Sequence, residues 1–347
     1  MAPFRRLGPL LLLAALACAC HARGSRGESL LFTLKDSRGD DHGDGELKYP
    51  LRPDMGPGSL DLLSLSASAG QGGTTFEATF ARPIAVPEKG RQVDASGSTL
   101  AEIARHGFYT FNLDIYVDQD RVPGSGRTDT LPGRNLTLAP GSAWEKVILL
   151  SPRPYESRDV LRKLWQDAAR AEYQRTQGPI DAAAARMLDA QVERALEERV
   201  FFPTRIRVTG ASVSFFVPEG FLGGQAQPTW GYAVAVTGAS LNRKMDLPAL
   251  FGQEDKSPGG LMLLDIRPGL SADRFGGGRL GDPNQSPVVD LLVPEGVRQE
   301  DVLGPRAPPW PAVVPAAPSE QEPPSLPQAP DAGAPAGEGG APGPGGL

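Results

Sequence analysis

Cysteine is nearly absent from this chain: Cys18 and Cys20 are the only two, and both lie within the first twenty residues. The remainder of the chain can therefore form no disulfide, although export would permit one. Basic residues are not in excess either, because 41 Asp and Glu outnumber 35 Lys and Arg. Proteins that bind nucleic acid usually have a basic patch, so we expect no nucleic acid partner.

Residues and motifs typical of catalysis are also scarce. The chain has three histidines, His21, His42 and His106, and it has neither a G-x-S-x-G elbow nor an H-E-x-x-H zinc motif. Carboxylate pairs are plentiful, but pairs alone do not specify an enzyme. We therefore expect a non-catalytic protein, with a hydrolase that acts through paired carboxylates as the enzymatic alternative.

Long apolar runs are missing beyond the N-terminus. There, Arg5 and Arg6 precede the apolar run at 7–17, and small residues follow it. This order is typical of a signal peptide, which we place at residues 1–20. The run is too short to anchor the chain across a bilayer. We expect an extracytoplasmic protein that is secreted, periplasmic or anchored by lipid to the outer membrane.

The cysteines of "ALACAC" leave the anchor open. The segment resembles a bacterial lipoprotein box, in which the Cys after the cleavage site is acylated, but neither Cys18 nor Cys20 has Leu at the third position before it. Lipidation at Cys18 or Cys20 and simple cleavage within this segment are the two alternatives. The membrane is a partner only if such a lipid is present.

Short alternating segments predict strands from about Leu30 to Leu303. Phe76, Ala78 and Phe80 fall on one face of their segment. Residues 109–117 alternate more clearly, with apolar side chains at odd positions and polar ones opposite, which predicts a half-buried strand with one polar face. Further strands are predicted at 146–150, 205–209, 212–218, 232–238, 261–266 and 288–294.

Turns rich in Gly, Pro and Asp separate these segments, so the fold class that we predict is mainly β, an antiparallel β-sandwich spanning residues 28–303. One segment differs, because apolar residues recur at helical spacing over residues 157–200 around an interrupting "GPI". We predict a helical hairpin inserted between strands, with Asp181 as the N-cap of its second helix. Its apolar stripe is expected to pack on the sandwich; the alternative is that it binds a partner protein.

The end of the chain, residues 304–347, is rich in Pro, Ala and Gly and has few large apolar residues. Such a composition buries too little surface to offset chain entropy, so we predict a disordered tail. Trp310 is interpreted as a stray aromatic within that tail, with a short docking motif as the alternative.

Three blocks of the sequence carry a resemblance to a known family. They are "LKDSRGDDHGDGELKYPLRPDMGPGSLDLLSLSA", "IYVDQDRVPGSGRTDTLPGRNLTLAPGSAWEKVILLS" and "GYAVAVTG…RFGGGRLGDPNQSPVVDLLVP". In this order they resemble the C-terminal domain of glucodextranase, a module that also occurs in amylopullulanase-like enzymes and surface-layer-associated proteins. The resemblance covers most of residues 30–298.

That family is similar in fold to family-nine carbohydrate-binding modules and DOMON domains, which are β-sandwiches. The resemblance implies an extracytoplasmic location, bound calcium, and attachment to a glycan or cell surface. It does not imply glucodextranase activity, because catalysis in those enzymes belongs to a separate domain.

The stretch "DSRGDDHGDG" crowds acidic residues among glycines. Calcium takes six to eight oxygen ligands, largely from carboxylates, carbonyls and water. The residue types and the resemblance together predict a stabilising calcium site, although the spacing is not that of an EF-hand. The alternative is a solvated acidic loop. The predicted ligands are Asp36, Asp40, Asp41, Asp44 and, from the next segment, Asp61.

A second acidic stretch flanks the Gly-Ser-Gly turn at 124–126. Asp114, Asp118, Asp120 and Asp129 are candidates for a second metal or a polar ligand, and the alternative is that they only shape and solvate a hairpin.

Sugar binding needs flat aromatic faces beside polar groups. The candidates are Tyr49, Tyr116, Trp144, Trp230 and Tyr232, each with a place in the core or at its rim as the alternative. Together these features predict a calcium-stabilised, extracytoplasmic module that binds carbohydrate or a cell-envelope polymer. The alternative is an envelope scaffold that binds a partner protein through the hairpin or the tail.

Overall fold

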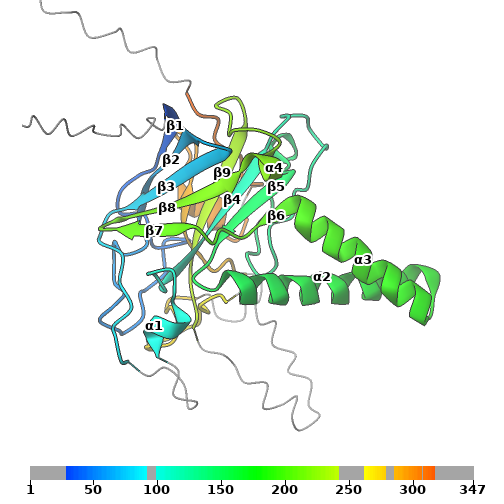
Figure 1. Ribbon diagram of the computed structural model, residues 1–347. Helices are drawn as coiled ribbons and strands as arrows, with labels where there is room; N and C mark the ends of the chain where they lie inside the picture. Colours follow the sequence, from blue (N-terminus) through cyan, green and yellow to red (C-terminus); the bar gives the residue numbers. More distant parts are fainter. Residues whose placement is uncertain (1–28, 92–98, 242–261, 279–284, 307, 317–347) are drawn as a thin grey trace, which may run out of the picture.

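The computed structural model describes residues 29–91, 99–241, 262–278, 285–306 and 308–316 (Figure 1). The predicted signal peptide, with Cys18 and Cys20, lies outside the described residues. So does the part of the predicted tail that follows residue 316.

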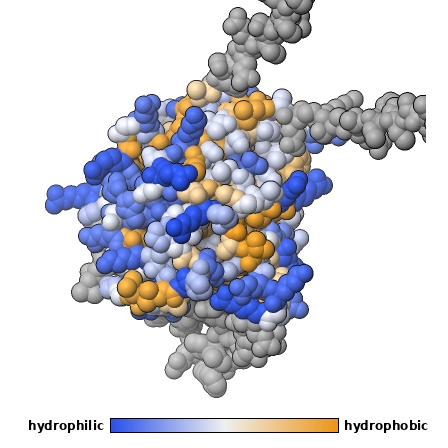
Figure 2. All heavy atoms as spheres, turned by 90° about the vertical axis from the view of Figure 1, so that its left-hand side faces the viewer, coloured by the Kyte–Doolittle hydropathy of each residue, from blue (hydrophilic) through white to orange (hydrophobic). Residues whose placement is uncertain are grey.

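The first of two sheets has five antiparallel strands in the order β1-β2-β3-β8-β7. Strands β3 and β8 bury alternate residues, and Phe76, Ala78 and Phe80 lie in the core as predicted. On the side of the molecule at the left of Figure 1, hydrophilic residues are interspersed with small hydrophobic patches (Figure 2). The strands are β1 (Ser29–Lys35), β2 (Leu62–Gly70), β3 (Gly73–Phe80), β7 (Ile206–Thr209) and β8 (Ser212–Pro218).

The second sheet has the order β10-β9-β4-β5-β6, and it is antiparallel except that β6 runs parallel to β5. Phe111, Leu113, Ile115 and Val117 of β4 belong to the same hydrophobic core as the first sheet. The two sheets thus form the predicted sandwich. The strands are β4 (Phe111–Asp118), β5 (Lys146–Leu150), β6 (Val200–Phe201), β9 (Gly231–Gly238) and β10 (Val288–Leu292).

The other face of β4 is not solvated, contrary to the prediction of one polar face. Every residue of β4 is buried. A second hydrophobic cluster lies on this side of the sheet, and it includes Tyr116, Trp144, Leu161 and Trp310. A strand's own sequence shows that a face is polar, but not whether other segments cover it.

The predicted helical hairpin is present as α2 (Pro154–Gln177) and α3 (Ala182–Arg199). Asp181 is the N-cap of α3, and its side chain accepts hydrogen bonds from the backbone N–H groups of Ala183 and Ala184. The hairpin joins β5 to β6, and because these strands are parallel a crossover connection is required. Figure 1 shows both helices projecting away from the sheets.

The apolar stripe of the hairpin is divided between two contacts. Leu161 and Leu196, near the base, join the second cluster on the sandwich, as predicted. Farther from the sandwich, Leu188 and Val192 of α3 are buried. The ion pair between Arg170 and Asp189, at 2.7 Å, links the two helices there. The stripe is therefore largely covered within the protein.

Residues 308–316 belong to the folded part of the chain, so the predicted start of the tail is wrong. Trp310 is fully buried, and its ring centroid lies 6.2 Å from that of Tyr116. The backbone N–H of Trp310 donates to Thr137, and Val313 pairs with Tyr232. Trp310 is thus a core residue. Its ring packs in the second hydrophobic cluster, although the segment that carries it is rich in Pro.

The remaining elements are short. They are α1 (Leu100–Ile103), the 3-10 helix η1 (Pro140–Ser142), α4 (Glu219–Leu222) and α6 (Gln299–Leu303). The predicted strand at 261–266 is not formed over its described residues, 262–266. Only single bridges pair Leu263 with Ala239 and Ile266 with Phe275, and Met262 has a positive φ of 55°, which breaks an extended backbone.

Candidate metal centre

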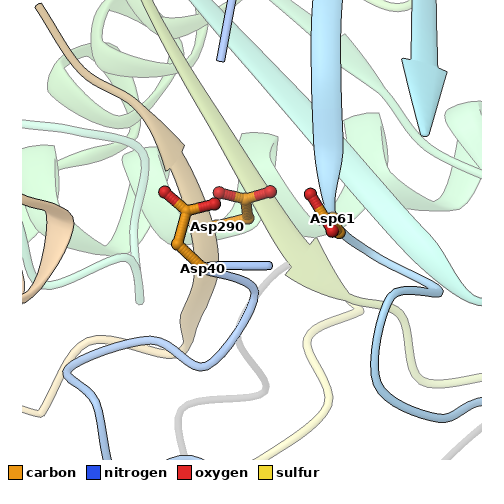
Figure 3. Close-up of side chains that lie close together, drawn as sticks. All are labelled: Asp40, Asp61 and Asp290. Carbon is orange, nitrogen blue, oxygen red and sulfur yellow. The ribbon is translucent and has the colours of Figure 1, made fainter. Parts of the chain in front are cut away.

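Three aspartates from distant parts of the chain converge where the two sheets meet (Figure 3). Asp40 lies in the loop after β1, Asp61 directly precedes β2, and Asp290 is in the middle of β10. One carboxylate oxygen from each lies within 4.8 Å of the other two. The backbone N–H of Leu62 donates to Oδ2 of Asp290, so β2 is tied to β10 at this point.

A fourth carboxylate, Asp36, lies beside these three and directly follows β1. Burial, followed by the charge of Asp40, raises the pKa of Asp36 to about 8. Burial, followed by the charges of Asp36 and Asp40, raises the pKa of Asp290 well above its ordinary value. We name Asp36, Asp40, Asp61 and Asp290 the acidic cluster.

Each member of the acidic cluster has one buried oxygen without a hydrogen-bond partner. These oxygens are Oδ2 of Asp36 and Oδ1 of Asp40, Asp61 and Asp290. A buried, unpaired carboxylate oxygen is costly, and four together need an explanation. Four carboxylates and no sulfur or imidazole form the ligand type that calcium or magnesium prefers over zinc. The residues therefore fit a hard divalent cation, of which the predicted calcium ion is one.

Gln299 of α6 holds the loop that bears Asp40 against β10. Its Nε2 donates to the backbone carbonyls of Asp40 and Gly43, at 2.5 and 3.0 Å, and its Oε1 accepts from the N–H of Leu291 at 2.6 Å. The N–H of Gly43 also donates to the carbonyl of Val289. These hydrogen bonds to backbone groups of the loop and of β10 hold Asp40 close to Asp290.

The other side of the same loop packs on a glycine-rich segment. Lys48 pairs with Gly276. A Cβ atom on Gly277 would lie 1.8 Å from the carbonyl oxygen of Glu46, and its φ is +80°. Only glycine permits both the conformation and the contact, which gives this part of the "GGG" run a structural role.

The structure brings together three of the five predicted ligands: Asp36, Asp40 and Asp61. Asp41 lies elsewhere in the loop, where its Oδ2 accepts from the Tyr49 hydroxyl and, at 2.7 Å, from the N–H of Gly58. Asp44 is not among the converging carboxylates of the described residues. Its Oδ2 accepts from Nε2 of Gln285 at 3.2 Å.

Asp290 was missed by the sequence reasoning. Its one signal is a single carboxylate in the otherwise apolar strand "VVDLLVP", where every residue of β10 is buried. A charged group is rarely fully buried unless it is paired or bound to a metal.

The second predicted acidic site is only partly assembled. Asp118 and Asp120 approach Glu145, with one oxygen of each within 4.8 Å of the others. A backbone N–H group donates to one oxygen of each carboxylate: Asp118 accepts from Arg121, Asp120 from Val122 and Glu145 from Gln119. Oδ2 of Asp118 is buried without a hydrogen-bond partner. The backbone hydrogen bonds support the alternative in which these carboxylates shape the turn.

The other two residues proposed for that site lie apart from it. Asp114 is buried and bonded through both carboxylate oxygens to Arg134, at 2.6 and 3.0 Å. Asp129 pairs with Arg127 on the surface. The predicted grouping of four aspartates is therefore wrong: Asp114 and Asp118 share a face of β4 but lie roughly 13 Å apart along it, and Asp129 is on the far arm of the loop.

Three of the five aromatic residues proposed for sugar binding are core residues. Tyr116, Trp144 and Tyr232 are at most 1% exposed, so their rings present no face to a ligand. Their polar atoms are bonded internally; for example, Trp144 Nε1 donates to the carbonyl of Asp129. Tyr49 and Trp230 are partly buried and pack against the core between the sheets.

The metal-free protein is expected to lose stability as the pH rises. Burial, as the largest cause, raises the pKa of Asp36 to about 8 and that of Asp40 to about 6, from an ordinary 3.8. Between pH 3.8 and pH 8 the folded chain therefore binds more protons than the unfolded chain. The free energy of unfolding falls as the pH rises through this range. In EDTA, calorimetry at pH 5.5 and pH 8 should therefore give the lower Tm at pH 8.

The matched variant for this experiment is Asp36→Asn, which should flatten the difference between the two pH values. A wild-type Tm in EDTA that is the same or higher at pH 8 would contradict the description of the acidic cluster.

The family comparison covers both sheets of the sandwich. A model of the C-terminal, SLH-like binding module of glucodextranase matches residues 31–314, from β1 to the segment that follows Trp310. The match includes the hairpin and all four members of the acidic cluster. No curated protein matches the chain. Because the match covers most of its length, the chain belongs to the family of the SLH-like C-terminal binding module of glucodextranase.

Proposed function

We propose that this protein is a non-catalytic, extracytoplasmic module that binds carbohydrate or a cell-envelope polymer and is stabilised by calcium. The observation that carries the proposal is the match of residues 31–314 to a family of binding modules. The scarcity of histidine and of catalytic motifs in the sequence supports a binding role.

Calcium has a structural role in this proposal. Asp40, Asp61 and Asp290, with Asp36 beside them, would hold the ion between β1, β2 and β10. Bound there, a divalent cation neutralises buried negative charge and links the two sheets. The four unpartnered oxygens support this role.

The proposed location rests on the N-terminal sequence. A basic start, an apolar run and small residues support export, with lipid attachment at Cys18 or Cys20 as one form of it. Among the described residues, none of the helices has the length and apolar character needed to cross a bilayer.

A retention experiment tests the binding function. The full chain in millimolar calcium is mixed with insoluble α-glucans and with isolated bacterial envelope, and the pelleted fraction is measured. We expect retention on at least one of these polymers and no release of soluble sugar. Failure to pellet with any of them would contradict the proposal. Bovine serum albumin is the control for nonspecific trapping.

Binding of a partner protein through the hairpin is less well supported. That alternative needs an apolar stripe facing solvent, whereas Leu161, Leu188, Val192 and Leu196 are buried. Among the described residues of the hairpin, the large hydrophobic side chains that are exposed are Tyr155, at its base, and Met187, in the second turn of α3.

A further inference from the structure

A pocket of about 680 Å³ lies between α1 and the start of α2. Its volume is in the range of about 300–1,000 Å³ that is typical of small-molecule sites. Arg105 and His106, which follow α1, line one side, and Arg153 and Tyr155 line the other. None of the residues that line it belongs to the acidic cluster, so the pocket is a separate feature.

Tyr155 offers the exposed aromatic surface that Tyr116, Trp144 and Tyr232 do not. It is the second residue of α2 and is 69% exposed, the highest value among the large hydrophobic residues described. Pro154 precedes it at the first helical position, where its fixed φ favours the start of a helix. The ring is therefore attached to a rigid backbone. Ile103 and Leu241 add apolar wall to the pocket.

Arg153 is a buried residue in the wall of the same pocket. The residue is 5% exposed, and its Nε and Nη1 have no hydrogen-bond partner. Its Nη2 donates to Oε1 of Glu156 at 2.8 Å, which fixes the guanidinium. Nε and Nη1 are closed to solvent, so they do not face the pocket, and Arg153 contributes a fixed, charged side chain to its wall. Arg153 is also the N-cap residue of α2, and its side chain accepts no hydrogen bond from the N–H groups of the first turn.

The charges around the pocket balance. Arg105 and Arg153 are opposed by Glu102 and Glu156. Burial, followed by the charge of Arg105, lowers the pKa of His106, which keeps its imidazole neutral at pH 7. An anionic ligand would meet the two carboxylates, and a cationic ligand would meet the two guanidinium groups. Hydroxyl groups, which donate and accept, suit such a set of side chains.

We infer that this pocket is the carbohydrate-binding subsite, and that it takes an uncharged hexose unit whose apolar C–H face packs on Tyr155 while its hydroxyls bond to the polar side chains that line the pocket. The inference rests on the proposed binding function and adds the place and the ligand class. Sequence reasoning did not single out Tyr155, because nothing local distinguishes an aromatic at the exposed start of a helix from one in the helix's buried stripe.

Affinity electrophoresis of the full chain tests the inference. Gels contain a neutral polymer (soluble starch or dextran) or an acidic one (polygalacturonate), with calcium throughout. The test variant is Tyr155→Ala, and the control is Tyr173→Ala, which removes a tyrosine from the same helix roughly 27 Å farther along its axis. We expect retardation by a neutral polymer, weakened about tenfold or more in Tyr155→Ala at unchanged Tm. Tyr173→Ala should behave as the wild type.

The outcomes separate this inference from the proposed function. If a neutral polymer retards the wild type and Tyr155→Ala equally, the subsite is wrong while the binding function stands. If only polygalacturonate retards the wild type, the uncharged ligand class is wrong. If neither gel retards it and no envelope fraction retains it, the proposed function itself fails.

Discussion

Replacing Arg134 with alanine is expected to lower the free energy of unfolding by about 3–5 kcal/mol. Arg134 and Asp114 are both fully buried, and the guanidinium bonds both carboxylate oxygens. Without Arg134, the charge of Asp114 on β4 would remain in the second hydrophobic cluster with no counter-ion. An uncompensated buried charge is costly, whereas the intact pair is close to neutral in its net effect.

Urea unfolding followed by circular dichroism measures this loss. The matched control is Arg175→Ala, which breaks an exposed pair with Glu172 on α2 and should change the free energy by less than about 0.5 kcal/mol. The double variant Arg134→Met with Asp114→Leu should recover much of the stability, because it removes both charges. A loss below about 1 kcal/mol in Arg134→Ala would contradict the buried pair.

The local pattern predicted the sandwich well. The alternation at Phe76, Ala78 and Phe80 and along 111–117 identifies the faces that fill the space between the sheets. The helical spacing over 157–200 and the N-cap at Asp181 identify the hairpin. In each case, the residues that decide the structure lie within a few positions of one another in the sequence.

The covering of the second sheet was not predictable in this way. Tyr116 and Asp114 read as a polar face, and Trp310 as part of a tail, yet Trp310 packs on Tyr116 across more than 190 positions of sequence. No periodicity within either segment records that contact. A large aromatic residue in a Pro-rich stretch was the one available signal.

The acidic cluster was likewise predictable only where its residues lie close together in the sequence. The Gly-rich loop after β1 predicted Asp36 and Asp40, and Asp61 followed from the next segment. Asp290 arrives from β10, more than 220 positions farther on, because the two sheets meet beside the loop. Local crowding also suggested Asp41 and Asp44, whose carboxylates bond to Tyr49 and Gln285 instead.

Calcium is expected to stabilise the folded protein by about 2.7 kcal/mol at one hundred times its dissociation constant. The variant Asp290→Asn should abolish this gain, because it removes one charged ligand at the centre of the acidic cluster. The asparagine keeps the shape of the side chain and an oxygen that can accept from the N–H of Leu62. Fold damage is therefore not expected from this change.

Without metal, Asp290→Asn is not expected to lower the stability of the protein, which distinguishes loss of a metal ligand from damage to the fold. In EDTA at pH 8, Asp290→Asn should be at least as stable as the wild type, because it removes one of several like charges that are buried together. With calcium it should be the less stable of the two. Asp44→Asn, in the same loop but outside the acidic cluster, should gain stability from calcium as the wild type does.

The most direct test of calcium stabilisation is calorimetric unfolding of the full chain in EDTA, and then in millimolar calcium, for the wild type, Asp290→Asn and Asp44→Asn. We predict that calcium raises the Tm of the wild type and of Asp44→Asn by several degrees and leaves that of Asp290→Asn unchanged. Equal Tm values for the wild type with and without calcium, or an equal rise in Asp290→Asn, would contradict the assignment of the acidic cluster as the metal centre.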